Sequence, residues 1–441
     1  MWNCFFSVAG GLPHTNNAVE GWHNALAAIL NAKHPITHPY GRCLSHQLLV
    51  GLSLVDRTAC SVSSLNLVYS WKFMEYELTS GAEDLIKNHS IPFSIDRWHD
   101  KLFIATPRFK TGVPSTLNFI NINGTAAKNM TSPKLIPYPD EAVHRLSAKK
   151  MTSIISIRVD PCGRLWALDT GEVAGKRETP PAIHVIDLKM NVIIRSHLFK
   201  EREDYDTDSQ LSTIAVDVTS SNCEDAYAYV TDYVRYMLII YSWRNDASYR
   251  ETHNFFHFDP LFGFIINNGR HIHVRHGIYS LATSPVDRDG YRRLYFSAYA
   301  STMQFIISTK ILQNKTFNYE RPMYEFKVMG SRGPRGQSSA ASLDEETGIL
   351  FYTLIAKNAL GCWNSFRGEE FSEKTQGIIV QDDTELSYPN DVRVDKTGIL
   401  WLLVNNYIAY QLNQLEADSF NFKIFKGKVR QIIRGSVCEE V

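Results

Sequence analysis

The densest group of side chains that could do chemistry is a set of histidines in the second half of the chain. His271 and His273 would share one face of a strand, because side chains two positions apart on a strand point the same way. Imidazoles are common zinc ligands, and His253, His257 and His276 lie nearby in the sequence. No cysteine or carboxylate is spaced to complete a tetrahedral site. The pattern therefore favours a polar loop, and we predict no metal site.

Motifs of known catalytic sites are scarce. Asp169-Thr170-Gly171 is similar to the aspartic-protease triplet, but that mechanism needs two carboxylates and the sequence has no second triplet. A Gly-x-Ser-x-Gly nucleophile elbow and a phosphate-binding loop are both missing from the sequence. We therefore expect no cofactor. If the chain is an enzyme, we nominate Asp391 or His276 as its general acid or base.

These residues belong to a pattern that recurs about every 60 residues. Each copy has an apolar run, a turn that usually contains aspartate, and a second apolar run. Alternating apolar residues predict strands, and a polar turn between two strands predicts a hairpin. The six pairs of runs span residues 93–96 with 101–105, 156–160 with 164–168, 214–217 with 226–230, 281–284 with 293–297, 341–344 with 349–353, and 391–395 with 399–403.

Hairpins at this spacing predict an all-β fold, a six-bladed β-propeller with four strands in each blade and the hairpin as its most regular part. Residues 65–75 alternate well and precede the first copy. We expect them to add a strand to the last blade and so close the ring, which removes a free sheet edge. The alternative is a set of unrelated hairpins in two domains, and the regular spacing argues against it.

The first 63 residues do not follow the repeat, so we predict a non-propeller N-terminal extension at 1–63 and the propeller at 64–441. Residues 16–32 have the apolar period of a helix, and residues 47–55 contain a short apolar run of signal-peptide length. One interpretation is an ordinary extension that packs on the propeller. The favoured one is a spurious or fused leader that contains a degraded signal peptide.

Composition narrows the class of protein. Lys+Arg and Asp+Glu number 46 each, and this balance argues against nucleic acid as a partner. No apolar stretch reaches the length of a membrane span. Three of the seven cysteines lie in the first 60 residues, which leaves an even set of four. These four cysteines, together with four Asn-x-Ser/Thr sequons, indicate that the protein folds in an oxidising compartment. The sequons are at Asn88, Asn123, Asn129 and Asn314.

The second copy of the repeat contains the most distinctive segment, Val-Asp-Pro-Cys-Gly-Arg-Leu-Trp-Ala-Leu-Asp-Thr-Gly at 159–171. It resembles the signature of the yellow / major royal jelly protein family. Further matching segments follow in family order, at residues 67–76, 96–103, 107–114, 135–139, 259–261, 361–364 and 388–392. The resemblance implies a secreted, often glycosylated, six-bladed propeller. Family members include cuticle-pigmentation proteins, royal jelly components and salivary proteins that bind biogenic amines, and some are linked to dopachrome conversion.

The resemblance also implies specific residues. The cysteines would pair as Cys162–Cys223 and Cys362–Cys438, although four cysteines allow three pairings. The amine-binding pocket of the family falls on Asn390, Asn405 and Tyr407 in this sequence. Position 390 departs from the family pattern, which has a hydroxyl residue there, and this puts the ligand specificity in doubt. The alternative is that Asn390 and Asp391 make turn hydrogen bonds and Tyr407 packs between blades.

We therefore expect a secreted, non-enzymatic protein that binds a small aromatic amine or catechol-type ligand at the channel mouth, in cuticle pigmentation or related insect physiology. One alternative is a dopachrome-converting isomerase. Another is a metal-dependent lactonase-like propeller, to which Asn390, Asp391 and Asn405 could contribute oxygen ligands.

Overall fold

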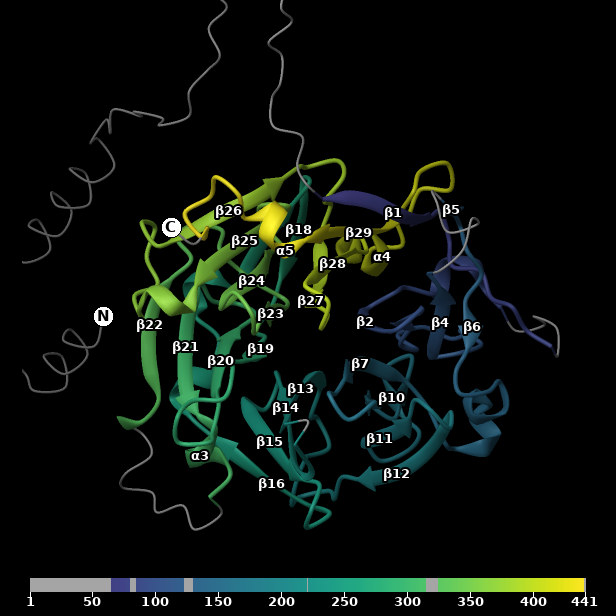
Figure 1. Ribbon diagram of the computed structural model, residues 1–441. Coiled ribbons are helices and arrows are strands. Elements are labelled where there is room, and N and C mark those ends of the chain that lie inside the picture. The colour runs from purple at the N-terminus through teal and green to yellow at the C-terminus, as the bar shows by residue number, and fades with distance from the viewer. Residues whose placement is uncertain (1–64, 80–84, 123–129, 220, 315–323, 440–441) are drawn as a thin grey trace, which may run out of the picture. The chain divides into compact units, whose positions relative to one another are not determined.

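A computed structural model describes residues 65–79, 85–122, 130–219, 221–314 and 324–439. The helix expected at 16–32, the apolar run at 47–55 and the sequons at Asn123 and Asn129 lie outside these residues. In the described part of the chain, six largely antiparallel sheets surround a common axis as the blades of a propeller (Figure 1). This arrangement confirms the predicted fold class.

The first three blades follow one another along the chain, and each runs from an inner strand at the axis to an outer strand at the rim. Their first two strands coincide with the predicted hairpins. Blade 1 comprises β2 (Ser94–Trp98), β3 (Lys101–Ala105), β4 (Leu117–Asn121) and β6 (Ile136–Pro137); blade 2 comprises β7 (Ile154–Val159), β8 (Arg164–Asp169), β11 (Ala182–Asp187) and β12 (Val192–Leu198); blade 3 comprises β13 (Leu211–Thr219), β14 (Asn222–Asp232), β15 (Met237–Ser242) and β16 (Ala247–Thr252).

The last three blades repeat this order, and the sixth also takes strands from the start of the chain. Blade 4 comprises β19 (Ile278–Thr283), β20 (Arg293–Ala298), β21 (Met303–Ser308) and β22 (Lys327–Ser331); blade 5 comprises β23 (Ala341–Leu343), β24 (Ile349–Leu354), β25 (Ala359–Asn364) and β26 (Gln376–Gln381); blade 6 comprises β27 (Pro389–Val394), β28 (Ile399–Val404), β29 (Phe422–Lys428), β1 (Asn66–Trp71) and β5 (Met130–Thr131).

Short elements connect the blades. Two small hairpins, β9–β10 and β17–β18, stand apart from the blade sheets. None of the helices in the described part of the chain is long and apolar enough to cross a membrane. The connecting elements are β9 (Glu172–Val173), β10 (Lys176–Arg177), β17 (Phe264–Asn267), β18 (Arg270–His273), α3 (Thr309–Leu312), α4 (Tyr407–Gln411), α5 (Val429–Ile432), η1 (Lys87–His89), η3 (Ala142–His144), η4 (Leu146–Ala148), η5 (Asn254–Phe256), η6 (Pro260–Phe262) and η8 (Ser365–Arg367).

The strand β1 closes the ring. It pairs antiparallel with β29, with Asn66 opposite Lys426 and Trp71 opposite Phe422. Trp71 is fully buried, and its Nε1 donates to the carbonyl of Pro133 at 2.8 Å. The prediction that residues 65–75 supply the closing strand is therefore confirmed. As a result, the first and last blades are held together by a sheet as well as by packing.

The core lies between neighbouring blades. Trp166 and Leu168 of blade 2, for example, pack with Ile239 and Tyr241 of blade 3 in one buried cluster. Inner strands are buried on both faces, so they read as nearly continuous apolar runs. This explains why the hairpins could be found in the sequence. Burial of one such large apolar side chain contributes about 1.5–3 kcal/mol.

The segment at 159–171 forms the turn between β7 and β8 and part of β8. Asp160 is almost completely buried and organises this turn. Its Oδ1 accepts from the backbone nitrogens of Cys162 and Arg164, at 2.8 and 3.0 Å. Its Oδ2 accepts from Arg164 Nε at 2.6 Å and from Trp166 Nε1 at 2.8 Å. The distinctive segment is therefore a structural clamp on a blade hairpin.

Two disulfides tie separate parts of the ring together. Cys162–Cys223 joins the β7–β8 turn of blade 2 to β14 of blade 3. Cys362–Cys438 joins β25 of blade 5 to the C-terminal segment. Both are the pairs that the family resemblance implies. Each crosses between segments more than 60 residues apart in the sequence, at separations of 61 and 76 residues.

Candidate functional site

The six inner strands line a narrow central channel. Its wall carries small hydroxyl side chains together with the ionisable pair Asp391 and Arg393. A cavity of about 20 Å³ lies among them, which is enough for one water molecule but not for an organic ligand. The residues around it are Phe93, Ser94, Ile155, Ser156, Ser212, Thr213, Tyr279, Ser339, Ala340, Asn390, Asp391 and Arg393.

The channel hydroxyls bond to the neighbouring inner strands. Ser94 Oγ accepts from the backbone nitrogen of Ile157, at 3.3 Å. Ser156 Oγ accepts in the same way from Ile214, at 3.2 Å. Each bond joins one blade to the next, so these side chains hold the ring together.

Asp391 takes the equivalent role where blade 6 meets blade 1. Its Oδ2 accepts from Ser94 Oγ at 2.9 Å and from the nitrogen of Ile95 at 3.0 Å. Its Oδ1 lies 2.7 Å from a terminal nitrogen of Arg393. Burial raises the pKa of Asp391 to about 6, against the opposing charge of Arg158. The carboxyl nominated as a general acid is thus engaged in ring closure.

Titration of the neighbouring carboxyl of Asp96 should make the free energy of unfolding depend on pH. Burial raises its pKa to about 6, opposed by bonds from Val159 and Arg97 and by the charge of Arg158. An unfolded aspartate titrates near 3.9, so between pH 7 and pH 5 the folded chain binds more protons at this site than the unfolded chain. We expect wild-type protein to gain about 1 kcal/mol of unfolding free energy relative to Asp96→Asn as the pH falls from 7 to 5.

Urea denaturation of both proteins at several pH values measures this difference. Subtracting the variant removes the contributions of buried histidines, such as His144, whose pKa burial lowers to about 3. A difference that stays constant with pH, or that changes in the opposite direction, would contradict the assignment of a raised pKa to Asp96.

Above one end of the channel lies a group of aromatic side chains, here named the mouth cluster. Its rings are in contact, with centroid distances of 5.5 Å for Tyr233–Tyr279, 5.0 Å for Tyr279–Tyr299 and 5.5 Å for Tyr388–Tyr407. The hydroxyls of Tyr299 and Tyr388 are hydrogen-bonded to each other. The mouth cluster comprises Phe93, Phe109, Tyr233, His276, Tyr279, Tyr299, Tyr388, Asn390, Asn405 and Tyr407.

The mouth cluster is electrically neutral at physiological pH. Burial raises the pKa of every one of its tyrosines, that of Tyr407 to about 12. Burial lowers the pKa of His276 to about 4, so its imidazole is uncharged between Tyr233 and Tyr299. Neutral phenols and one neutral imidazole provide aromatic faces together with hydrogen-bond donors and acceptors.

The structure brings the three sequence-predicted residues together at this mouth. Asn390 Nδ2 donates to the carbonyl of Phe93 at 2.6 Å, and Asn405 Nδ2 donates to that of Pro92 at 3.0 Å. The two amides therefore hold the chain as it enters blade 1. Tyr407 is half-buried, and its ring contacts Phe93 at 5.7 Å. Asn390 thus makes a structural hydrogen bond, as the alternative expected, but its partner is the segment that leads into blade 1 and not a local turn.

One side-chain atom of these three residues makes no structural hydrogen bond. Asn405 is fully buried, and its Oδ1 accepts no hydrogen bond from any residue in the described ranges. A buried polar atom without a partner is unfavourable by about 1–3 kcal/mol. Native structures rarely keep such an atom without a ligand, water or catalytic reason. Asn405 is connected to the mouth cluster through its backbone, because its nitrogen donates to the carbonyl of Tyr388 at 3.3 Å.

The β17–β18 hairpin covers the mouth cluster. Ile265 and Ile272 pack against Tyr279, Tyr299 and Tyr388 in one cluster. Polar side chains at the hairpin turn then reach blades 5 and 6. Those contacts are Asn267 Nδ2 to the carbonyl of Ile355 at 2.7 Å, Asn268 Nδ2 to the carbonyl of Asp383 at 2.8 Å, and Arg270 Nε to Gln414 Oε1 at 2.9 Å.

The histidine pair singled out in the sequence lies on the outer face of this hairpin. His271 and His273 are exposed, and both rings contact Phe264, at 5.3 and 4.6 Å. Among the described residues, no three His, Cys, Asp or Glu side chains are grouped so as to hold a metal ion. The pair therefore has no third ligand of these types within the ranges that the structure describes.

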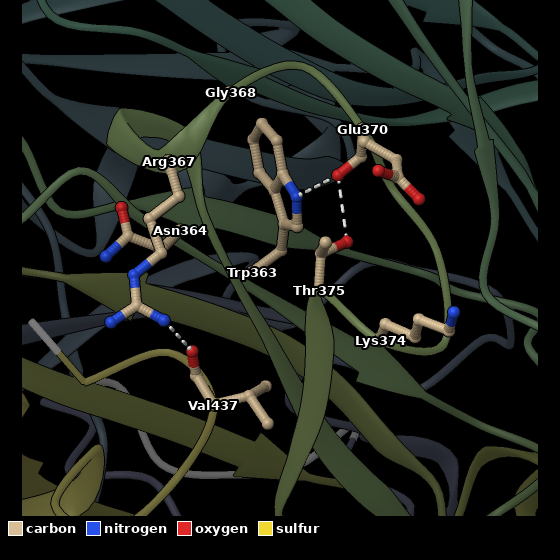
Figure 2. Close-up of a pocket in the computed structure, with 8 residues that line it drawn as sticks. All are labelled: Trp363, Asn364, Arg367, Gly368, Glu370, Lys374, Thr375 and Val437. Atoms are coloured by element: carbon tan, nitrogen blue, oxygen red, sulfur yellow. Dashed lines mark hydrogen bonds between the residues drawn. The ribbon is translucent and has the colours of Figure 1, made fainter.

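A larger cavity, of about 330 Å³, lies away from the channel, between the β25–β26 connection and the C-terminal segment. Three of its polar side chains bond to backbone carbonyls of the cavity wall, as Figure 2 shows. Trp363 Nε1 and Thr375 Oγ1 both donate to the carbonyl of Glu370 at 2.8 Å, and Arg367 donates to that of Val437 at 2.7 Å. None of the sequence-predicted ligand residues lines this cavity. We therefore place the candidate site at the channel mouth despite its smaller volume.

The sequence did not indicate four of the mouth tyrosines or the covering hairpin. Tyr233, Tyr279, Tyr299 and Tyr388 come from blades 3, 4 and 6 and share no local motif. The one available signal was positional, since Tyr388 directly precedes the inner strand of the last repeat.

Comparison with known proteins agrees with this architecture. The sequence profile of the family described as Major royal jelly protein matches residues 152–438. Protein yellow of Drosophila pseudoobscura pseudoobscura is 34% identical over 408 residues, covering 89% of this chain and 71% of the relative. Protein yellow of Drosophila melanogaster is 34% identical over 413 residues, covering 89% and 74%. The chain therefore belongs to the yellow / major royal jelly protein family.

Proposed function

We propose that the protein binds a small aromatic amine or catechol-type molecule at the mouth cluster without transforming it, and that it acts in cuticle pigmentation or related insect physiology. The observation that carries this proposal is the orphan Oδ1 of Asn405, a buried residue whose backbone nitrogen bonds to Tyr388 of the neutral mouth cluster. The name Protein yellow, carried by the relatives, supports the pigmentation role.

The chemistry of the mouth suits such a ligand. An ammonium or catechol hydroxyl would donate to Asn405 Oδ1, which needs a donor. The rings of Tyr407 and Phe93 lie 5.7 Å apart and would contact an indole or catechol ring. An ammonium group over an aromatic face gains a further cation–π attraction.

Entry of the ligand requires movement of the covering hairpin. The cavity among the inner strands holds about 20 Å³, so the space for an aromatic ligand must open when the ligand binds. The hairpin is held to blades 5 and 6 through side-chain bonds from Asn267, Asn268 and Arg270, which can break without disturbing a blade. Such lids open on microsecond to millisecond timescales in other proteins.

Calorimetric titration with serotonin, dopamine and dopachrome, combined with dopachrome absorbance measurements, tests the proposal. We expect saturable binding of at least one compound and no turnover. Turnover would replace the binding function with the isomerase, in which the neutral His276 imidazole is placed to accept a proton. Turnover that a chelator abolishes would favour the lactonase-like function. Absence of any heat or absorbance change would overturn the proposal.

We also propose that the protein is secreted and glycosylated. Two disulfides are present, and disulfides persist in oxidising compartments. The sequon residues Asn88 and Asn314 are exposed. A mass decrease on treatment with a peptide N-glycosidase would support modification at these sites. The division between an extension at 1–63 and a propeller at 64–441 stays a prediction that N-terminal sequencing of the mature protein would test.

A further inference from the structure

A serine, a histidine and an aspartate are joined in line across three neighbouring strands of blade 2. Ser196 Oγ lies 2.8 Å from His184 Nδ1, and His184 Nε2 lies 3.3 Å from Asp169 Oδ2. His184 on β11 is directly opposite Ser196 on β12. Asp169 ends β8, the strand on the other side of β11. None of these three residues belongs to the mouth cluster.

The carboxylate of Asp169 sets the hydrogen positions in this relay. Its oxygens accept from the backbone nitrogens of Thr152, Ser153 and Gly171, at 2.6, 2.7 and 2.8 Å. Burial would raise the pKa of Asp169, but bonds from His184 and the backbone hold it below the usual value. An ionised carboxylate only accepts, so His184 carries its hydrogen on Nε2. Its Nδ1 is therefore free to accept the Ser196 hydroxyl proton, as in a hydrolase triad.

The burial pattern suits a reaction at the surface. His184 and Asp169 are 4% and 2% exposed, so the base and its partner are shielded from water. Ser196 is exposed on the outermost strand of the blade. The exposed apolar side chains of Val192, Ile194 and Leu198 lie on the same strand.

The outer edge of β12 supplies a further element. In the described sheet β12 pairs with β11 alone, so backbone N–H groups along its other edge have no strand partner. Such groups can stabilise the negative charge that develops on an ester carbonyl under attack.

We propose that Ser196 is a nucleophile that accepts acyl groups from activated esters with small apolar or aryl parts. Its Oγ forms a bond to the ester carbonyl carbon while its proton passes to His184 Nδ1. The ester C–O bond then breaks, and the departing alcohol or phenol takes that proton. Water, deprotonated by the same imidazole, releases the acid and restores the serine.

A second serine–histidine–aspartate group, with His197 on β12 of blade 2 and with Asp246 and Ser248 in blade 3, provides a matched control. Ser248 Oγ lies 2.8 Å from His197 Nε2, and His197 Nδ1 lies 3.2 Å from Asp246 Oδ1. Here the carboxylate is 57% exposed and also accepts from Tyr241. The hydrogen bonds of the two groups are alike, but Asp169 is shielded from water and Asp246 is not. Ser248 therefore shows what reactivity a serine–histidine bond gives when it is purely structural.

The experiment exposes the full-length protein to a fluorophosphonate probe and to p-nitrophenyl acetate, and maps the modified peptide by mass spectrometry. We expect modification at Ser196, its loss in Ser196→Ala, and at least a tenfold slower release of p-nitrophenolate in that variant. Ser248→Ala should keep the wild-type rate. His184→Gln should lower the rate about 100-fold through loss of the base.

Thermal unfolding of each variant shows whether it is folded. If His184→Gln does not fold, the comparison of Ser196→Ala with wild type still tests the proposal, because residue 196 is exposed and its replacement should not disturb the fold. Lack of modification at Ser196 in folded wild-type protein would overturn the proposal, as would equal rates for wild type and Ser196→Ala. Equal modification of Ser196 and Ser248 would also overturn it, because the relay in blade 2 would then have no special reactivity.

Discussion

Replacement of Asp160 by alanine is expected to lower the free energy of unfolding by about 3–5 kcal/mol. Asp160 forms a buried ion pair with Arg164 at 2.6 Å, and the two side chains are 0% and 7% exposed. The variant leaves the Arg164 guanidinium buried without its carboxylate. It also leaves Trp166 Nε1 without an acceptor, in a side chain that is fully buried between blades.

Urea denaturation monitored by tryptophan fluorescence measures this change. Asp160→Asn is the matched control, because it keeps an acceptor oxygen in nearly the same volume and should lose less stability than the alanine variant. A loss below about 1 kcal/mol for Asp160→Ala would be typical of an exposed ion pair. That result would show that the 159–171 segment is not the clamp described for the blade 2 hairpin.

The parts of the fold that could be predicted are those that depend on residues close together in the sequence. The strands β3 (Lys101–Ala105) and β28 (Ile399–Val404) coincide with apolar runs that the sequence displays directly. Each strand is buried on both faces and follows a turn that contains aspartate. The apolar run and the turn residues therefore predict the same strand, within about ten residues of sequence. Closure by residues 65–75 was predictable because a ring of this kind needs one more strand to remove its free edge.

The parts that escaped prediction depend on contacts between distant segments. The β17–β18 hairpin was expected only as a polar loop, since its histidines face outward and its apolar residues point down onto tyrosines from other blades. The bond from Asn267 to Ile355 spans 88 residues, and no local pattern predicts such a partner. The Ser196–His184–Asp169 relay likewise follows from strand register, which the sequence does not display.

The mouth residues show a mixed outcome for a physical reason. The resemblance indicated Asn390, Asn405 and Tyr407, and the structure shows that both amides bond to backbone carbonyls of residues 92 and 93. An amide has both donor and acceptor atoms, so one side chain can serve ring closure and ligand binding at once. Only the orphan Oδ1 of Asn405 distinguishes the second role, and its lack of a partner is visible only in three dimensions.

Replacement of Asn405 by leucine is expected to weaken binding of the aromatic amine or catechol ligand by about 10–100-fold, with a change in unfolding free energy of no more than about 1 kcal/mol. A hydrogen bond to a charged donor contributes about 1.5–3 kcal/mol, and its loss accounts for the change in affinity. Leucine has a similar volume and removes the orphan oxygen, which offsets the lost bond to Pro92.

Asn118 provides the matched control. It is a fully buried amide on β4 whose Oδ1 likewise has no partner among the described residues, while its Nδ2 donates to Thr106. Asn118→Leu should therefore change stability by a similar small amount and leave the affinity unchanged. If Asn405→Leu binds as tightly as wild type, the orphan oxygen does not contact the ligand. If it binds weakly but is also strongly destabilised, Asn405 acts through ring closure instead. Only a loss of affinity at preserved stability assigns the acceptor to the ligand, because it separates contact with the ligand from the structural bond to Pro92.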